Sequence, residues 1–244
     1  MKNTDYTLII TGCINPSSNV YALALKDSNE RRIQTIKSIE FFLTETKAQK
    51  IVYCENSGAE VEEKLMQLAK AKHKSFEWIG FNGDIAETEK RGKGYGEGEI
   101  LNYAIKHSKI VSNNDYIIKV TGRIKVLNFN IIVSKMKNDR IYINLYERRK
   151  SAKTLFWGMP RITYEKFFID CNQDVDDRNW HSLENAYGAT IVNNNLKYAF
   201  IPSPLILDGI AGTSGNKYNQ NILQRNKSYI RMHGEKFINS FVRR

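Results

Sequence analysis

The most unusual stretch of this 244-residue sequence is KRGKGYGEGEILNYAI, residues 90–105, where glycine stands at every second position from Gly92 to Gly98. Glycine lets a backbone approach a ligand closely, and a helix that begins after such a stretch offers free N–H groups. Arg91 and Lys93 add positive charge. Glycines, a helix N-terminus and cations together predict a site for a diphosphate.

The stretch has the spacing of neither common phosphate-binding motif. Its glycines give neither the G-x-x-x-x-G-K-[ST] of a P-loop nor the G-x-G-x-x-G of a dinucleotide-binding fold. Glu97 and Glu99 fall in the first predicted helical turn, where a carboxylate stabilises the helix dipole. For Glu97, a contact with a ligand hydroxyl is the alternative.

Alternating strand and helix patterns surround this stretch. Apolar runs predict strands, and apolar residues recurring every three or four positions predict helices. The expected strands are 6–13, 50–54, 75–81 and 115–121, and the expected helices are 30–44, 60–72 and 97–108. Such alternation predicts an α/β fold with a mainly parallel sheet flanked by helices.

The pattern becomes less regular after Asn128, as in an α+β arrangement. We expect strands within 140–147, 154–160 and 197–202, and helices within 161–170 and 180–193. No linker rich in proline, glycine or serine separates the two halves, so one continuous fold is expected. The last residues are basic with interleaved apolar side chains, which suits a helix on an anionic surface or one packed on its own domain.

Polar loops follow the first four predicted strands. They are TGCINPSSNV from Thr11, ENSG from Glu55, NGDIAETEKRGKGYGEG from Asn82, and TGRIKVLN from Thr121. In an open parallel sheet, ligands bind beyond the carboxyl ends of the strands. The loops therefore predict a small-ligand site at one edge of the sheet.

The bulk composition narrows the possible partners. The net charge of +11 favours a polyanion, such as nucleic acid, anionic lipid or a phosphorylated substrate, although charge alone equally fits a solvated basic surface. No apolar run is long enough to span a bilayer, and the N-terminus reads as a first strand, not a signal peptide. Three widely spaced cysteines without a CxxC pair indicate reduced thiols in a cytoplasmic protein.

The Thr-Gly turn, ENSG, RGKGYGEGE and DYIIKVTGRIKV together resemble bacterial GT-A-like glycosyltransferases of capsule and lipopolysaccharide O-antigen gene clusters. The similarity covers most of the first 130 residues. It implies a GT-A-like, Rossmann-type sheet and the transfer of a hexosyl or related group. The donor would be a nucleotide-sugar, with a UDP-sugar expected, and the acceptor a glycan or undecaprenyl-linked glycan. The protein would be cytoplasmic, at the inner face of the plasma membrane and its anionic lipid, and would not bind nucleic acid.

The resemblance also implies a division of the chain and a set of donor-binding residues. Residues 1–128 would form the nucleotide-sugar-binding half, 129–215 the acceptor and catalytic half of the same domain, and 216–244 a basic tail helix. The implied donor-binding residues are Thr11, Gly12, Arg31, Glu55, Asn56, Asp84, Arg91, Lys93, Gly94, Tyr95, Gly96, Glu97, Thr121, Gly122 and Lys217.

The chain departs from the family where a metal site would stand. The fourth strand of the family usually ends in Asp-x-Asp, which binds a divalent metal, whereas this chain has Thr121, Gly122 and Arg123. We therefore expect no metal ligands. A guanidinium matches phosphate oxygens, so Arg123 could offset charge on the departing nucleoside diphosphate; the alternative is a pair with a nearby carboxylate.

Candidates for the remaining roles lie in the second half. An inverting transfer needs a base for the acceptor hydroxyl. Glu184 in HSLENAYG stands where the family places it, and Asp208 is a second candidate; a surface role for Glu184 is the alternative. Trp157 could form a sugar platform at the acceptor, although aromatics at such spacing are usually core.

Three other functions remain open at this point. A basic nucleic-acid-binding module fits the charge but lacks a known signature. A sugar nucleotidyltransferase fits the alternating pattern but normally carries a glycine-rich basic loop after its first strand, which TGCINPSS is not. The chain could also be a catalytically inactive relative that is retained as an assembly partner, because it lacks the Asp-x-Asp motif.

Overall fold

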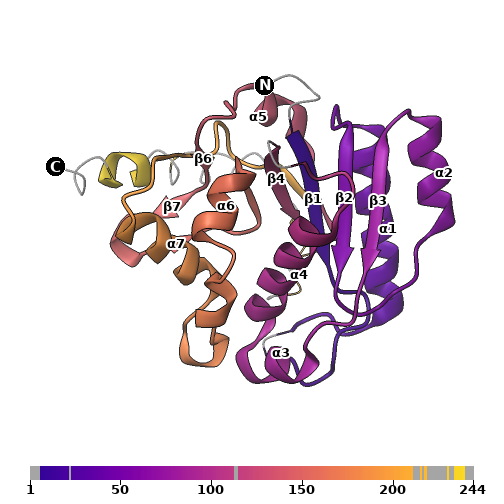
Figure 1. Cartoon of the computed structure of the whole chain (residues 1–244), viewed down its shortest axis with the longest axis horizontal. Coiled ribbons are helices and arrows are strands. Elements are labelled where there is room, and N and C mark those ends of the chain that lie inside the picture. The colour runs from indigo at the N-terminus through magenta and orange to yellow at the C-terminus, as the bar shows by residue number, and fades with distance from the viewer. Residues whose placement is uncertain are drawn as a thin grey trace.

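A seven-stranded sheet in the order β10-β6-β9-β4-β1-β2-β3 forms the centre of the molecule (Figure 1). The computed structural model describes residues 6–21, 23–112, 115–210, 215, 217–218, 230 and 234–239. The strands of the sheet are β1 (Tyr6–Gly12), β2 (Lys50–Glu55), β3 (Ser75–Gly80), β4 (Tyr116–Thr121), β6 (Ile141–Tyr142), β9 (Phe156–Pro160) and β10 (Tyr198–Ala199).

The first half of the chain supplies four neighbouring parallel strands, and the second half extends the same sheet. β1 pairs in parallel with β2 and β4, and β2 with β3. β9 runs antiparallel to β4 and to β6, and β10 is parallel to β6. Two small ribbons accompany the sheet: β5 (Ile124–Val126) with β11 (Leu207–Gly209), and β7 (Leu145–Tyr146) with β8 (Ser151–Ala152).

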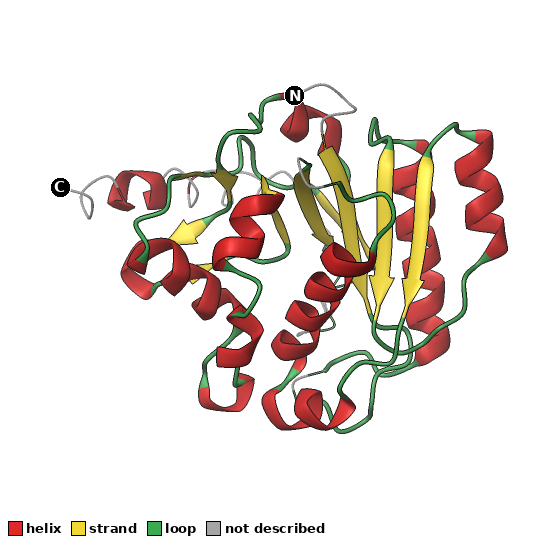
Figure 2. Ribbon diagram, viewed as in Figure 1, coloured by secondary structure: helices red, strands yellow, loops and turns green. Residues whose placement is uncertain are grey.

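Helices cover both faces of the sheet (Figure 2). They are α1 (Ser28–Thr44), α2 (Glu63–Ala71), α3 (Ile85–Arg91), α4 (Lys93–His107), α5 (Phe129–Ser134), α6 (Arg161–Phe167) and α7 (Leu183–Asn193). Short 3₁₀ turns are η1 (Glu147–Arg149), η2 (Cys171–Asp174) and η3 (Asp177–Asn179).

The alternation of side chains along each strand separates two cores. Leu8 and Ile10 of β1 pack with α1, α2 and α5, whereas Ile9 packs with α4, α6 and α7. All three are fully buried. Each such side chain contributes about 1.5–3 kcal/mol relative to an exposed one, so the two cores hold the strand ends of β1 and β4 in fixed positions.

The predicted α/β class with a mainly parallel, helix-flanked sheet is confirmed, and so is the less regular second half. The helix expected from residue 97 instead begins at Lys93, so the glycine-rich stretch is mostly helical. Most of the predicted tail, 216–244, lies outside the described residues; within it, 234–239 are helical. Among the described residues, no helix has both the length and the apolarity needed to cross a membrane.

Candidate functional site

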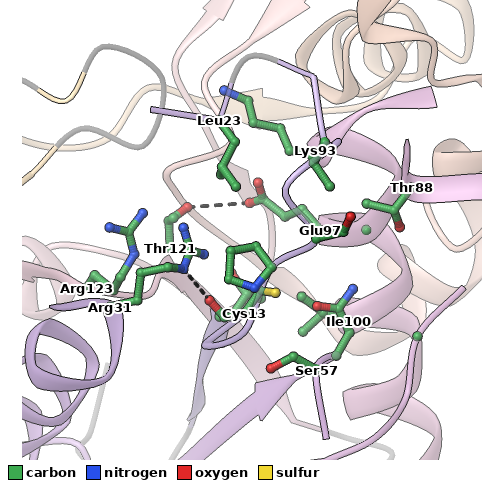
Figure 3. A pocket seen from close by; sticks show the side chains of 18 of the residues that line it. Cys13, Leu23, Arg31, Ser57, Thr88, Lys93, Glu97, Ile100, Thr121 and Arg123 are labelled. Carbon is green, nitrogen blue, oxygen red and sulfur yellow. Dashed lines mark hydrogen bonds between the residues drawn. The ribbon is translucent and has the colours of Figure 1, made fainter. Parts of the chain in front are cut away.

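A cleft of about 310 Å³ lies at the carboxyl ends of β1, β2 and β4 (Figure 3). Its walls come from the loop after β1, the start of α1, the loops after β2 and β3, α3, the first turns of α4, the turn after β4 and the start of α7. Lys93 and Arg123 both line it. The predicted meeting of cationic segments along one rim is therefore present in the structure.

A tight turn after β4 directs Arg123 into the cleft. The N–H of Gly122 donates to the Thr11 carbonyl oxygen at 2.6 Å, and a Cβ at this position would lie 2.3 Å from that oxygen. Only glycine therefore fits beside the end of β1. Arg123 adopts a positive φ of 66°, which is uncommon outside glycine, and its Nη1 donates to Gln34 Oε1 at 3.0 Å.

Two guanidinium groups lie beside each other on one side of the cleft (Figure 3). Arg31 is 5% exposed, and it donates from Nε to the Cys13 carbonyl oxygen at 2.7 Å and from Nη1 to that of Leu25. Burial, followed by the charge of Arg31, lowers the pKa of Arg123 to about 10. Neither arginine forms an ion pair with a carboxylate among the described residues. An anion would relieve their mutual repulsion.

The other side of the cleft carries two carboxylates joined through a buried lysine and a threonine. Lys119 is fully buried, and its Nζ donates to Glu97 Oε1, to Thr121 Oγ1 at 2.8 Å and to the Thr154 carbonyl oxygen at 2.7 Å. The Thr154 hydroxyl donates to Glu184 Oε1 at 3.2 Å. Glu97 is thus neutralised by an ammonium group, whereas Glu184 has a hydroxyl partner. Of the two, only Glu184 forms no ion pair within the described part of the chain, which makes it the candidate base.

The N-terminus of α4 is occupied by a side chain of the protein. Gly94 N–H donates to Asp177 Oδ2 at 2.9 Å, so the expectation that this N–H is free for a diphosphate is wrong. Burial raises the pKa of Asp177 above its ordinary value. The acidic segment DVDD, residues 174–177, thus places one of its carboxylates against the start of α4.

The glycines of α4 mainly make room for the segment that carries Asp177. An added Cβ would lie 2.5 Å from Asp177 Cβ at Gly92 and 2.4 Å from Asn172 Cβ at Gly98. Gly96 lines the cleft beside Asn56 and Thr88. The glycine-rich stretch therefore serves close packing between the two halves of the chain, and only part of it faces the cleft.

Ten of the residues singled out by sequence line the cleft: Thr11, Gly12, Arg31, Asn56, Lys93, Gly96, Glu97, Thr121, Arg123 and Glu184. Glu55 lies behind it, fully buried, where its carboxylate accepts from the N–H groups of Ser57 and Ala59 and so fixes the loop after β2. Those not in contact with the cleft are Asp84, Arg91, Gly94, Tyr95, Gly122 and Lys217.

Three predicted roles conflict with the positions of the side chains. Arg91 is paired with Glu87 and donates to the Gln173 carbonyl oxygen, away from the cleft. Trp157 has an exposed fraction of 0% and stacks on Tyr164, so it is a core residue and offers no surface to a sugar. Asp208 pairs with Lys125 at 3.0 Å and does not line the cleft.

Two cleft residues, Thr154 and Tyr218, and the buried Lys119 that supports the cleft were not found from the sequence. Lys119 had a usable signal, because a lysine inside the apolar strand YIIKVT must find a partner when it is buried. Thr154 and Tyr218 had none, since each is an ordinary polar residue in a loop, whereas Ser57 and Asn82 lie in loops that the sequence assigned to the site as a whole.

The donor atoms at the end of β4 do not fit a divalent metal. Thr121, Gly122 and Arg123 supply no carboxylate, and a cation there would face the two guanidinium groups. Within the described part of the chain, no group of three or more His, Cys, Asp or Glu side chains is placed to hold a metal ion.

No family model and no curated protein matches this sequence. Several solved structures are similar to it. A protein described as a nucleotide-diphospho-sugar transferase from Desulfovibrio desulfuricans G20 has 9% identity, a TM-score of 0.46 and coverage of 82% of this chain and 80% of its own.

Two others are a bifunctional glycosyltransferase, WbbM, and an active-site mutant of LgtC. The bifunctional WbbM has 10% identity and a TM-score of 0.48, with coverage of 96% of this chain and 45% of its own. An active-site mutant of LgtC has 9% identity and a TM-score of 0.46, with coverage of 91% and 83%. These are distant likenesses, and the fold class rests on the sheet topology itself.

Proposed function

We propose that this chain is a glycosyltransferase that moves a sugar from a nucleotide-sugar to a glycan or lipid-linked acceptor in the synthesis of a surface polysaccharide. The observation that supports this most is the pair Arg31 and Arg123, adjacent at the strand ends and without a carboxylate partner among the described residues. A buried and a half-buried like charge facing a cleft favour a ligand with more than one negative charge.

The donor's diphosphate would lie between the arginine pair and Lys93. Guanidinium groups match phosphate oxygens and stabilise the charge that develops on the departing nucleoside diphosphate. The loops after β1 and β2, with Asn56 and Ser57, would then contact the nucleoside, and Glu97 a hydroxyl of the sugar. A UDP-sugar is the first donor to test.

Glu184 would act as the base. Its carboxylate takes the proton of the acceptor hydroxyl, and the acceptor oxygen forms a bond to the anomeric carbon of the sugar. The bond between that carbon and the phosphate oxygen breaks, and the electron pair leaves with the nucleoside diphosphate. Arg31, Arg123 and Lys93 receive this negative charge.

The proposed function is tested by replacing the base, Glu184, with a residue of the same shape that cannot accept the proton. Glu184→Gln should lower turnover about 100-fold or more while donor binding is retained, because a general base contributes on this scale. Donor hydrolysis, with water as the acceptor, and a donor-induced shift in melting temperature are the two readouts. The control is Glu165→Gln, an exposed residue paired with Arg161 on α6.

Unchanged donor hydrolysis in Glu184→Gln would exclude Glu184 as the base. A wild-type protein that binds a donor without turning it over would favour an inactive relative.

We also propose that the chain works at the inner face of the plasma membrane, and the net charge supports this. A surplus of 11 positive charges would attract the chain to anionic lipid, where a lipid-linked acceptor is available. Sedimentation with phosphatidylglycerol vesicles that is lost at high salt would agree with this. Absence of sedimentation at low salt would contradict it.

A further inference from the structure

A second hollow, of about 600 Å³, lies beside α7 and is separate from the cleft. The first turn of α7 borders both: Glu184 lines the cleft, whereas Ser182 and Asn185 line the second hollow. We name this hollow the α7 groove. Its other side is formed by Arg149 and Lys150 at the end of η1.

The edge of the α7 groove carries the most exposed large hydrophobic side chain of the described residues. Trp180 is 87% exposed. It has a positive φ of 64°, a conformation that is unfavourable for a large side chain. An exposed ring in such a conformation adds little to the stability of the fold. This points to a role in binding another molecule.

The loop that presents Trp180 is held rigidly. Asp176 and His181 exchange two backbone hydrogen bonds, of 2.7 and 2.9 Å, and so close the loop. Asp176 Oδ1 accepts from the N–H groups of Arg178 and Asn179, and Oδ2 accepts from the Asn179 side chain at 2.7 Å. The backbone that carries the ring is therefore held in one conformation, so little backbone freedom is lost when the ring binds a ligand.

The rest of the groove is mostly polar, and its charged side chains are Arg149, Lys150 and Asp174. Asn185, Asn193 and Asn194 supply amides, and Ser182 and Thr190 supply hydroxyls, of which that of Ser182 is bonded to Asn185 Oδ1 at 2.7 Å. Lys150 is held by a hydrogen bond to Asn193 Oδ1 at 3.0 Å. Amides and hydroxyls beside one flat aromatic ring match a saccharide, whose C–H face stacks on the ring while its hydroxyls form hydrogen bonds.

We propose that the α7 groove binds a saccharide, and that Trp180 is its stacking platform. This proposal rests on the proposed function in one respect: the saccharide would be a part of the acceptor glycan distant from the reacting hydroxyl. It replaces the buried Trp157 as the aromatic contact. Because α7 borders both hollows, a chain bound in the groove would be kept beside the catalytic cleft.

A printed array of defined oligosaccharides, probed with the labelled protein, tests this directly. We expect a subset of glycans to retain the wild type, and Trp180→Ala to lower that signal roughly tenfold or more, as loss of a stacked aromatic does. Ile162→Ala is the matched control, because Ile162 is 69% exposed on α6 outside the groove. It should bind as the wild type does.

The outcomes separate this proposal from the proposed function. The shift in melting temperature caused by UDP-glucose should be the same in Trp180→Ala and the wild type, whereas Arg123→Ala should lose that shift and keep glycan binding. Failure of the proposed function alone would leave a groove that binds glycans without donor binding. No retained glycan, or glycan binding unchanged in Trp180→Ala, would overturn the saccharide proposal. So would Trp180-dependent binding of a single-stranded RNA oligonucleotide, the other ligand that stacks on an exposed ring.

Discussion

At the scale of single residues, the cleft is organised by one buried cation. Lys119 is fully buried and joins Glu97 to the backbone of Thr154, and the Thr154 hydroxyl reaches Glu184. A buried charge is tolerated only when it is paired and hydrogen-bonded. The lysine therefore fixes the orientation of both sides of the acidic wall.

The first prediction concerns this lysine. Lys119→Met keeps most of the length of the side chain but leaves Glu97 without its counter-charge, so we expect the free energy of unfolding to fall by about 3 kcal/mol. Urea unfolding measures it. The double variant Glu97→Gln/Lys119→Met has no unpaired carboxylate and should recover part of the loss. Equal stability of the single variant and the wild type would show that the pair does not stabilise the fold.

At the scale of elements, α4 shows a helix whose glycines are required by its neighbours. Alanine is a better helix former than glycine by about 1 kcal/mol, yet four glycines occupy the first turns of α4 and the residue before it. Glycine is required here because Asn172 and Asp177 occupy the space into which side chains at these positions would project.

The second prediction follows from this contact. Gly98→Ala should lower the free energy of unfolding by about 1–2 kcal/mol, because the added Cβ would lie 2.4 Å from Asn172 Cβ and the overpacking outweighs the gain in helix propensity. Thermal and urea unfolding test it. At Gly234 an added Cβ meets no atom within 4 Å, so Gly234→Ala should cause no loss. A stabilised Gly98→Ala protein would contradict the packing shown here.

The third prediction concerns the carboxylate at the start of α4. Burial raises the pKa of Asp177, so the folded state holds this proton more tightly than the unfolded chain. Its contribution to stability is present below the unfolded pKa and is lost as pH rises through the folded pKa.

Asp177→Asn removes the titrating group and keeps an oxygen for Gly94 N–H. The variant should therefore gain stability relative to the wild type as pH rises from about 4 to about 7. Urea unfolding at a series of pH values measures the difference. The raised pKa would be contradicted if the difference in free energy of unfolding between the variant and the wild type stayed constant over this pH range. It would also be contradicted if the difference changed in favour of the wild type.

The sequence predicted the elements that follow simple periodicity and missed what depends on distant contacts. The strands near residues 6–13 and 115–121 were found because both faces of a central parallel strand are apolar. The start of α4 was placed four residues late, because glycine argues against helix when its neighbours are unknown. Trp157 was misassigned because both faces of β9 pack against other elements of the protein. The spacing of residues along one strand does not show whether its second face is covered.

At the scale of the whole molecule, the position of the site was predictable and its chemistry was only partly so. Parallel strands bring their carboxyl ends to one edge, which is why the loops after Thr11 and Thr121 were expected to meet. The link from Lys119 through Thr154 to Glu184 joins strand, loop and helix that are far apart in sequence. No local pattern contains such a link.

The whole molecule thus presents the arginine pair on one side of a cleft and Glu97, Glu184 and Lys93 on the other, held by a sheet that both halves of the chain build. The central claim is that Arg31, Arg123 and Lys93 bind the diphosphate of a nucleotide-sugar without a metal ion. Loss of Arg123 should weaken donor binding and leave the fold intact, because its side chain contacts the cleft and one glutamine.

The most direct test is a thermal-shift titration with UDP-, GDP-, CMP- and dTDP-sugars, each with and without EDTA, on the wild type, Arg123→Ala and Arg140→Ala. Arg140 is a matched control, because it pairs with Asp139 and does not line the cleft. We expect one nucleotide to raise the melting temperature of the wild type and of Arg140→Ala, EDTA to leave this shift unchanged, and Arg123→Ala to lose it. A shift that EDTA abolishes, or one that persists in Arg123→Ala, would contradict the central claim.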